Sequence, residues 1–591
     1  MDLIAGGHPL PAGSRARILL DRAIASRVGP GPLAWALNAA FALSALAFAF
    51  VTYRFFVLLN SGVSDYSWGD VSWIHQAVFN FLHGRPLQTS IYYYSGDGVI
   101  GNPHPYANQL AMHINLSPYL FSFGYWLFPG LTGLYATVML FNIAGFSWLI
   151  FLLLRSQDPD GTPVKYPIAM TILLLSNFFD IITYKCLFPL YQGVFILALH
   201  HAMLKGRRNM FMATAALFFL VSEDAALFAV TYAMSLFLVC KKDRFYPGFL
   251  LAAAVGYLSA VMFVLQPALK TDMLTEGPVP SDIILRLGRF LRGESTFFFG
   301  DVRYYAHFVP AAFAAVFLLC KGVPARVYLG SFLLVASAPA SHWFITLVNG
   351  GGHHLMPITT TVILAVILTM GAMKIERGRG LESFRLAAAL GLFLFCLAGF
   401  HRKAPRGPGP GEQALQAMAT NQATIAAMRS IPKEKSVVYW TSRNVEGFVV
   451  DRNDIWRFPS YFDLADYLVM QKDTQDTFFE AGPETGGQET RSPGLNIGKR
   501  GGSALISSLY AGTHHSSGKT ARVSRRTIDL LLKDLVTDRK THVVEREDEH
   551  VLLLRRRERH EFIMPRSSVG FGWIRNLPRF LGRRYRAAPF S

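Results

Sequence analysis

The chain has 591 residues, of which 51% are hydrophobic and only 16% are charged. In soluble proteins about a quarter of all residues are charged, so this composition excludes an ordinary soluble protein. The formal net charge is +18, yet the basic residues lie mainly between long apolar runs. That placement is typical of a membrane protein, and it argues against nucleic acid as the partner that explains the charge.

The chain begins with a basic segment, residues 1–33, followed by an apolar run over about 34–59. This run is long enough to cross about 30 Å of hydrocarbon, which predicts a retained first helix. Ten further apolar runs lie near 132–154, 166–184, 188–204, 210–222, 225–240, 247–268, 304–320, 327–341, 354–373 and 384–400. We therefore predict a mainly α polytopic membrane protein with about 11 transmembrane helices over residues 34–400.

Lysine and arginine in short loops resist translocation, so their placement predicts the orientation of the helices. With a cytoplasmic N-terminus, about eighteen positive residues lie in the inner segments against about seven in the outer loops. The inner set includes the turns at 205–208 and 241–244. This bias predicts a cytoplasmic N-terminus and, with an odd number of helices, an extracytoplasmic C-terminal region.

The first outer loop, residues 61–116, contains SDYSWGDVSWIHQAVFNFLHGRPL, residues 64–87. After Gly69 the apolar positions follow helical spacing, which predicts an amphipathic helix on the membrane surface with Asp70 at its N-terminal end. Asp70 is either the cap of that helix or a general base that deprotonates an acceptor hydroxyl. The tyrosines of IYYY, residues 91–94, fit either the membrane interface or a sugar ring.

Two more polar groups interrupt apolar sequence. Glu223 and Asp224 stand between two apolar runs, either in a plain loop or facing a polar cavity in the membrane. His353 and His354 follow three glycines at the head of a predicted helix. Imidazoles and free backbone N–H groups there suit an anion such as a phosphate, while the glycines alone also fit a flexible turn.

After a Pro/Gly linker at 401–411, short strands are predicted at SVVYW, residues 436–440, and ADYLVMQ, residues 465–471. An amphipathic helix is predicted at 527–536, and THVVE and HVLLLRR are predicted to pair as a hairpin. These elements predict a small α/β domain over 412–556. The basic aromatic tail at 557–591 is either solvated or bound to anionic headgroups.

The segments DVSWIHQAVFNFLHGRPL, AMHINLSP, SEDAAL and HHLMP, with SVVYWTSRN and ADYLV near the C-terminus, resemble the domain-of-unknown-function 2079 family of prokaryotic membrane proteins. That family looks like a branch of the GT-C fold glycosyltransferases. The resemblance implies an inverting glycosyltransferase with Asp70 as the catalytic base and Asp65, Glu223 or Asp224 as a second acid. Gln76, His113 and His354 match further positions of the family. We expect substrate binding by His75, Gln76, Arg85, His113, His353 and His354, with Mg²⁺ or Mn²⁺ as a candidate cation.

On this reading the protein lies in the cytoplasmic membrane and belongs to the cell-envelope machinery. It transfers a sugar from a polyprenyl-phosphate donor to an extracytoplasmic acceptor, which is a glycan, a lipid or a protein. The alternative is a non-catalytic binding or assembly protein on the same scaffold. A transporter would show paired broken helices in two similar halves, and no such internal repeat is visible in the sequence.

Overall fold

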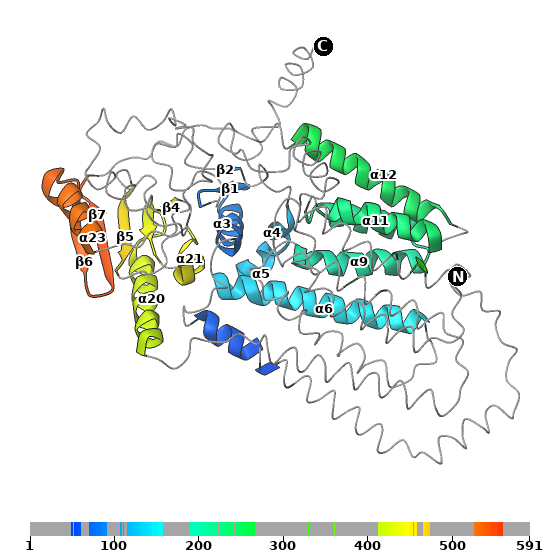
Figure 1. The fold of residues 1–591 in the computed structure, drawn as a ribbon, viewed down its shortest axis with the longest axis horizontal. Helices are drawn as coiled ribbons and strands as arrows, with labels where there is room; N and C mark the ends of the chain where they lie inside the picture. The colour runs from blue at the N-terminus through cyan, green and yellow to red at the C-terminus, as the bar shows by residue number, and fades with distance from the viewer. Residues whose placement is uncertain are drawn as a thin grey trace, which may run out of the picture.

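A computed structural model describes residues 46, 49–50, 52–60, 70–91, 107–108, 110, 115–157, 189–222, 224–239, 243–265, 329–330, 333, 360, 364, 412–441, 443–452, 454–457, 465–472 and 525–558. Within this part the chain is mostly helical, with a five-stranded sheet near its C-terminus. Figure 1 shows the long helices on one side, the sheet on the other, and helix α3 between them.

The helical region follows chain order from residue 70 to residue 265. Its elements are α3 (Asp70–Leu82), α4 (Ser117–Leu120), α5 (Ser122–Leu127), α6 (Leu131–Gln157), α9 (Pro189–Leu204), α10 (Arg208–Phe219), α11 (Asp224–Val239) and α12 (Phe245–Ala260), with strands β1 (Gln88–Thr89) and β2 (Ala107–Asn108) paired antiparallel. α6 packs against α9, and α11 packs against both α9 and α12. The long helices therefore form one bundle (Figure 1).

Two described helical stretches are long and apolar enough to cross a membrane, Leu131–Leu153 in α6 and Phe245–Leu265, which is α12 extended by a π-helical turn. At 1.5 Å per residue they measure about 34 Å and 31 Å, which matches about 30 Å of hydrocarbon. α9 and α11 supply shorter apolar stretches, Tyr191–Leu204 and Ala225–Phe237. Of the eleven or so predicted spans, two in the described chain, those near 132–154 and 247–268, thus have the length that a membrane crossing needs.

Several predicted spans cannot be compared with the structure. The apolar runs at 166–184, 304–320, 327–341, 354–373 and 384–400 lie outside the described residues, apart from isolated positions. The predicted run at 210–222 is a 12-residue helix, α10, because the chain turns at both of its ends. Such a helix is about 18 Å long, too short to cross the hydrocarbon alone.

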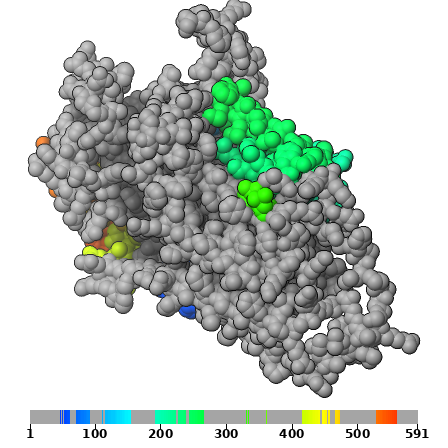
Figure 2. Space-filling view, turned by 45° about the vertical axis from the view of Figure 1, so that its right-hand side comes forward, coloured from blue at the N-terminus to red at the C-terminus, as the bar shows by residue number. Residues whose placement is uncertain are grey.

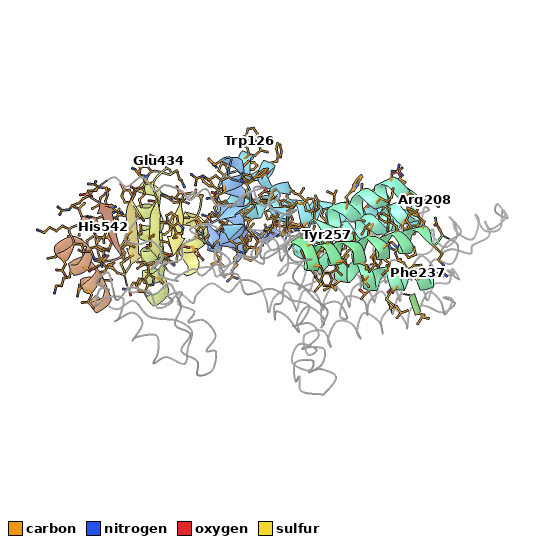
Figure 3. The ribbon with its side chains drawn as sticks, turned by 90° about the horizontal axis from the view of Figure 1, so that it is seen from above. Trp126, Arg208, Phe237, Tyr257, Glu434 and His542 are labelled. Atoms are coloured by element: carbon orange, nitrogen blue, oxygen red, sulfur yellow. The ribbon has the colours of Figure 1, made fainter. Side chains whose placement is uncertain are left out.

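The two basic turns of the bundle lie at the same end. Gly206, with φ of 66°, ends α9 in the left-handed conformation that glycine adopts most easily. Arg208, at the start of α10, pairs with Asp243 at 3.5 Å and lies 4.7 Å from the ring centre of Phe245. Figure 3 shows Arg208 and Phe237 at one end of the molecule. Glu434 and His542, in the region of the sheet, lie at the opposite end.

The outward surface of the bundle is apolar. Met234 on α11, Val255 on α12 and Phe263 in the following turn are all exposed. Figure 2 shows the residues of these helices as one continuous stretch of the surface. An exposed apolar face of this kind suits contact with lipid chains.

The C-terminal sheet has the strand order β4-β3-β5-β7-β6. Its elements are α20 (Glu412–Ser430), β3 (Val437–Trp440), α21 (Arg443–Val449), β4 (Ile455–Arg457), β5 (Tyr467–Gln471), α23 (Arg525–Leu532), β6 (His542–Glu547) and β7 (Val551–Arg556). β3 pairs parallel with β4 and β5, whereas β7 pairs antiparallel with β5 and β6. The predicted strands at 436–440 and 465–471 and the hairpin are confirmed. The predicted helix at 527–536 is α23, continued by a π-helix over Lys533–Asp538.

Both faces of this sheet are covered, because successive residues along each strand point to opposite sides. Val437 and Tyr439 belong to a core that also contains residues of α20 and α21 and of the helical region. Val438 and Trp440 belong to a second core with α23. The sheet is therefore the middle layer between α20 and α21 on one side and α23 on the other, and its first core continues into the bundle.

Candidate functional site

Helix α3 is the centre of the candidate site. It begins at Asp70, and residues 71–80 are all buried. α4 and α5 pack against it from the bundle, and α21 packs against it from the C-terminal region. The predicted helix is confirmed, but it lies inside the protein and not along the membrane surface. Its polar side is buried because the C-terminal region supplies hydrogen-bonding partners for it, which the helical spacing of apolar residues does not reveal.

His75 connects α3 to both neighbours. Its Nδ1 lies 2.7 Å from the carbonyl oxygen of Gly447 in α21, and its Nε2 lies 2.7 Å from the hydroxyl of Tyr125 in α5. A carbonyl oxygen only accepts, so Nδ1 carries the proton and Nε2 of the neutral ring accepts from Tyr125. Burial lowers the pKa of His75, which keeps this neutral form. His75 thus holds α3 between α5 and α21.

Gln76 makes all four hydrogen bonds that its amide allows. Its Oε1 accepts from the hydroxyl of Thr89 at 2.8 Å and from the backbone N–H of Ser90 at 2.9 Å. Its Nε2 donates to the hydroxyl of Ser90 at 2.7 Å and to the carbonyl of Arg452 at 3.4 Å. The Ser90 hydroxyl donates in turn to the carbonyl of Ile455 in β4. Gln76 therefore ties α3 to β1 and to the edge of the C-terminal sheet.

Two arginines complete this contact. Arg85, just after α3, forms an ion pair with Asp454 at 2.8 Å. Arg452 is buried, and its guanidinium donates to the carbonyls of Met428 at 2.9 Å and Ile431 at 3.2 Å, at the C-terminal end of α20. The positive charge of this guanidinium is also stabilised by the negative end of the α20 dipole. Arg452 could not be identified from the sequence, because one arginine in a polar stretch carries no pattern that signals burial.

The end of the bundle next to α3 brings together residues from four segments. The backbone N–H of Leu116 donates to the carbonyl of Leu220 at 2.9 Å. Gln192 donates to the hydroxyl of Ser222 at 3.5 Å. A Cβ on Gly193 would lie 2.6 Å from the hydroxyl oxygen of Thr360, so α9 closely approaches that residue. The turn before α4, the turn before α11 and the start of α9 therefore meet at this end.

Several predicted site residues lie outside the described residues. They are Asp65, His113, Glu223, His353 and His354. Asp70 and Asp224 begin α3 and α11, but their side chains lie outside the description too. Of the predicted set, the structure brings His75, Gln76 and Arg85 together, and all three contact the C-terminal region. Their assigned role in substrate binding stays a prediction.

A divalent cation was the candidate cofactor. Within the described residues, no group of three or more His, Cys, Asp or Glu side chains is placed to hold a metal ion. The carboxylates that the sequence offers as oxygen ligands, Asp65, Asp70, Glu223 and Asp224, have side chains outside the description, so the candidate cation stays a prediction.

The apolar helices and the comparison with known families define a membrane protein. The chain belongs to the family described as Predicted membrane protein (DUF2079), whose model matches residues 70–479, well over half of the chain. The match begins at the first residue of α3 and includes the strands β3, β4 and β5.

Comparison with curated proteins finds no match. Among solved structures, the chain is similar to the crystal structure of the Archaeoglobus fulgidus oligosaccharyltransferase in complex with zinc and sulfate. The identity is 12% and the TM-score 0.36, and the match covers 68% of this chain and 64% of that chain. The chain thus spans less than two thirds of the oligosaccharyltransferase.

Proposed function

We propose that this protein is a membrane glycosyltransferase that transfers a sugar from a polyprenyl-phosphate donor to an extracytoplasmic acceptor. The observation that carries the proposal is the position of α3. The helix begins at Asp70 and is held at the end of the bundle where Leu116, Leu220 and Ser222 also meet. These three residues are close in sequence to His113, Glu223 and Asp224, so the candidate polar groups belong to segments that converge.

The proposed orientation follows from the basic turns. Figure 3 shows Arg208 and Phe237 at the end of the bundle away from the sheet, and Arg244 donates to the backbone carbonyl of Phe237 at that end. Positive residues stay on the cytoplasmic side, so α3 and the C-terminal sheet would lie outside the cell. In this arrangement the chain has about 11 spans in the cytoplasmic membrane, and residues 412–556 form an extracytoplasmic α/β domain. A donor anchored in the outer leaflet would present its phosphate at the level of α3.

In the proposed reaction, the Asp70 carboxylate takes the proton of an acceptor hydroxyl. The hydroxyl oxygen then bonds to the anomeric carbon, while the bond from that carbon to the phosphate oxygen breaks. Attack from the side opposite to the phosphate inverts the configuration. The lipid phosphate leaves as an anion, which His353 and His354 would neutralise. Arg85 would have to exchange Asp454, its partner at 2.8 Å, for that phosphate. No step is assigned to a metal ion.

A non-catalytic binding or assembly protein on the same scaffold is the second candidate. One observation favours it: His75, Gln76 and Arg85 are all engaged with the C-terminal region. Side chains that hold the fold together need not contact a substrate. The two candidates differ in whether lipid-linked sugar is bound and whether it is consumed.

The test compares the full chain with Asp70→Asn, since asparagine caps a helix about as well as aspartate. Mass spectrometry of lipids that co-purify with each protein should find a polyprenyl-phosphate sugar in both. Sugar transfer from that donor should fall about 100-fold or more in Asp70→Asn. The matched control is Asp243→Asn, at the opposite end of the bundle, which should leave transfer unchanged. Bound donor without transfer in the unaltered protein would favour the binding protein, and absence of donor would contradict the glycosyltransferase.

A further inference from the structure

The short helices α4 and α5 carry an exposed apolar surface, which we call the aromatic patch. It consists of Leu120, Phe123, Trp126, Leu127 and Phe128, whose exposed fractions are 51%, 68%, 66%, 49% and 64%. No aspartate, glutamate, lysine or arginine occurs between residues 114 and 154. Water-facing helices normally carry such charges, and contiguous exposed apolar patches mark contact surfaces.

The opposite side of α5 is fixed against the protein. Tyr125 donates its hydroxyl proton to His75. A Cβ on Gly124 would lie 2.3 Å from Thr137, so the backbone of α5 closely approaches α6. These contacts set the rotation of α5 and turn the aromatic patch away from the bundle. In Figure 3 Trp126 lies at the edge of the molecule, pointing away from it.

The aromatic patch continues into the apolar surface of α6. Phe128 stands three residues before Leu131, where the membrane-crossing stretch of α6 begins. Leu140 and Trp148, further along α6, are also exposed. Polar contacts mark the start of the stretch: the Thr132 hydroxyl donates to Asn60, whose carbonyl accepts from Gln422 of α20. Large aromatic side chains at such a boundary are typical of the membrane interface.

We propose that the aromatic patch inserts into the lipid leaflet at the α3 end of the bundle, at the boundary between headgroups and acyl chains. Segments of this kind reach about 5–10 Å into that boundary. The segment that lies on the membrane is thus α4–α5, which packs against α3, and not α3 itself. Because Tyr125 bonds His75, the inserted segment sets the height of α3 above the lipid surface. The proposal holds whether or not the protein is an enzyme.

The test uses tryptophan emission of the full chain in nanodiscs. The emission of Trp126 is the difference between the unaltered protein and Trp126→Phe, and Trp148→Phe and Trp456→Phe serve as matched controls. Trp148 is exposed on α6, further into the stretch, whereas Trp456 is buried in the sheet region. The quenchers are lipids brominated near the headgroup end or near the methyl end of the acyl chain, and aqueous iodide.

Lipids brominated near the headgroup end should quench most of the Trp126 emission, and iodide should have little effect on it. Trp148 lies 17 residues, or about 25 Å, beyond Leu131 and thus near the opposite headgroup boundary. It should therefore also respond mainly to bromine near the headgroup end, which makes it the control for a lipid-facing tryptophan, whereas Trp456 should respond to none of the quenchers. If Trp126→Phe fails to insert, Phe128→Trp adds emission from the same patch with the same expected response. Quenching by iodide, or by none of the quenchers, would overturn the proposal. The first result means a water-exposed patch, and the second means one covered by protein, such as a second copy of the chain.

Discussion

Arg452 is a buried cation that backbone carbonyls satisfy. Burial lowers the pKa of Arg452, and the negative charges of Asp451 and Glu434 partly offset this shift by raising it. Its backbone carbonyl also accepts from Gln76, so the residue connects the end of α20 to α3. The position of one arginine therefore determines how the C-terminal region meets the candidate site.

Replacing Arg452 should destabilise this contact strongly. Arg452→Met keeps most of the volume but leaves the carbonyls of Met428, Ile431 and Pro432 without their donor. We expect a loss of about 3 kcal/mol in the free energy of unfolding. Thermal unfolding of the detergent-solubilised chain measures it, with Arg429→Met, an exposed site on α20, as the control. Equal midpoints for the two variants would contradict this role.

The stability of the C-terminal sheet should depend on pH because His542 is buried there. Burial and the nearby charge of Arg556 lower its pKa to about 4, below the usual 6.5. The folded state then binds fewer protons than the unfolded state between these values, so stability rises with pH in that window. The contribution of His542 is complete above about pH 6.5 and is lost as the pH falls toward 4.

The loss should reach about 3 kcal/mol at most, since one pKa unit corresponds to about 1.4 kcal/mol. His542→Phe has no group to titrate and should unfold with a smaller dependence on pH between 6.5 and 4. Thermal unfolding midpoints across this range, measured for both proteins, provide the check. Parallel pH profiles would show that His542 does not carry the effect.

At the scale of elements, the spacing of helices in the bundle depends on particular glycines. A Cβ on Gly193 in α9 would lie 2.3 Å from Phe146 of α6 and 2.6 Å from Thr360. Real Cβ atoms do not come so close to other atoms, so the Phe146 ring, the Thr360 side chain or the helices themselves would have to shift. Gly256 on α12 has no atom within 4 Å of its added Cβ.

These two glycines allow a matched comparison. Gly193→Ala should destabilise the bundle by about 1–3 kcal/mol through overpacking. Gly256→Ala should be neutral or stabilise by up to about 1 kcal/mol, because alanine favours helix more than glycine. The readout is the thermal midpoint of each variant in the same detergent. A stabilising Gly193→Ala would mean that α9 and α6 have room that the structure does not show.

The elements of the C-terminal region could largely be predicted from sequence. β3, β5, β6, β7 and α23 occur where strand and helix patterns placed them, since alternation and helical spacing are local signals. α20 was not predicted, because the apolar positions of this 19-residue helix show no clear helical period. β4 and α21 were not predicted either, because IWR is only three residues long and RNVEGFV has no clear helical period. Short elements such as these are decided by pairing and packing.

At the scale of the molecule, the orientation argued from the basic turns has a direct test. A reporter that is active only outside the cytoplasm should work when fused after residue 420, in α20. A reporter that is active only inside should work at Arg207, in the turn before α10. Positive residues at that end resist translocation, which is the reason for this expectation. The opposite pattern would reverse the sides assigned to α3 and to the sheet.

The amino-acid sequence already identifies a membrane protein, because apolar runs and the placement of basic residues are properties of composition and order. It also placed Asp70 at the start of a helix. The surroundings of that helix are visible only in the folded chain, because His75 and Gln76 bond to partners 372 and 376 residues away. A local pattern records which residues avoid water, whereas the partner of a buried polar group depends on how distant segments fold together. For that reason α3 is buried, and the surface exposed beside it belongs to α4 and α5.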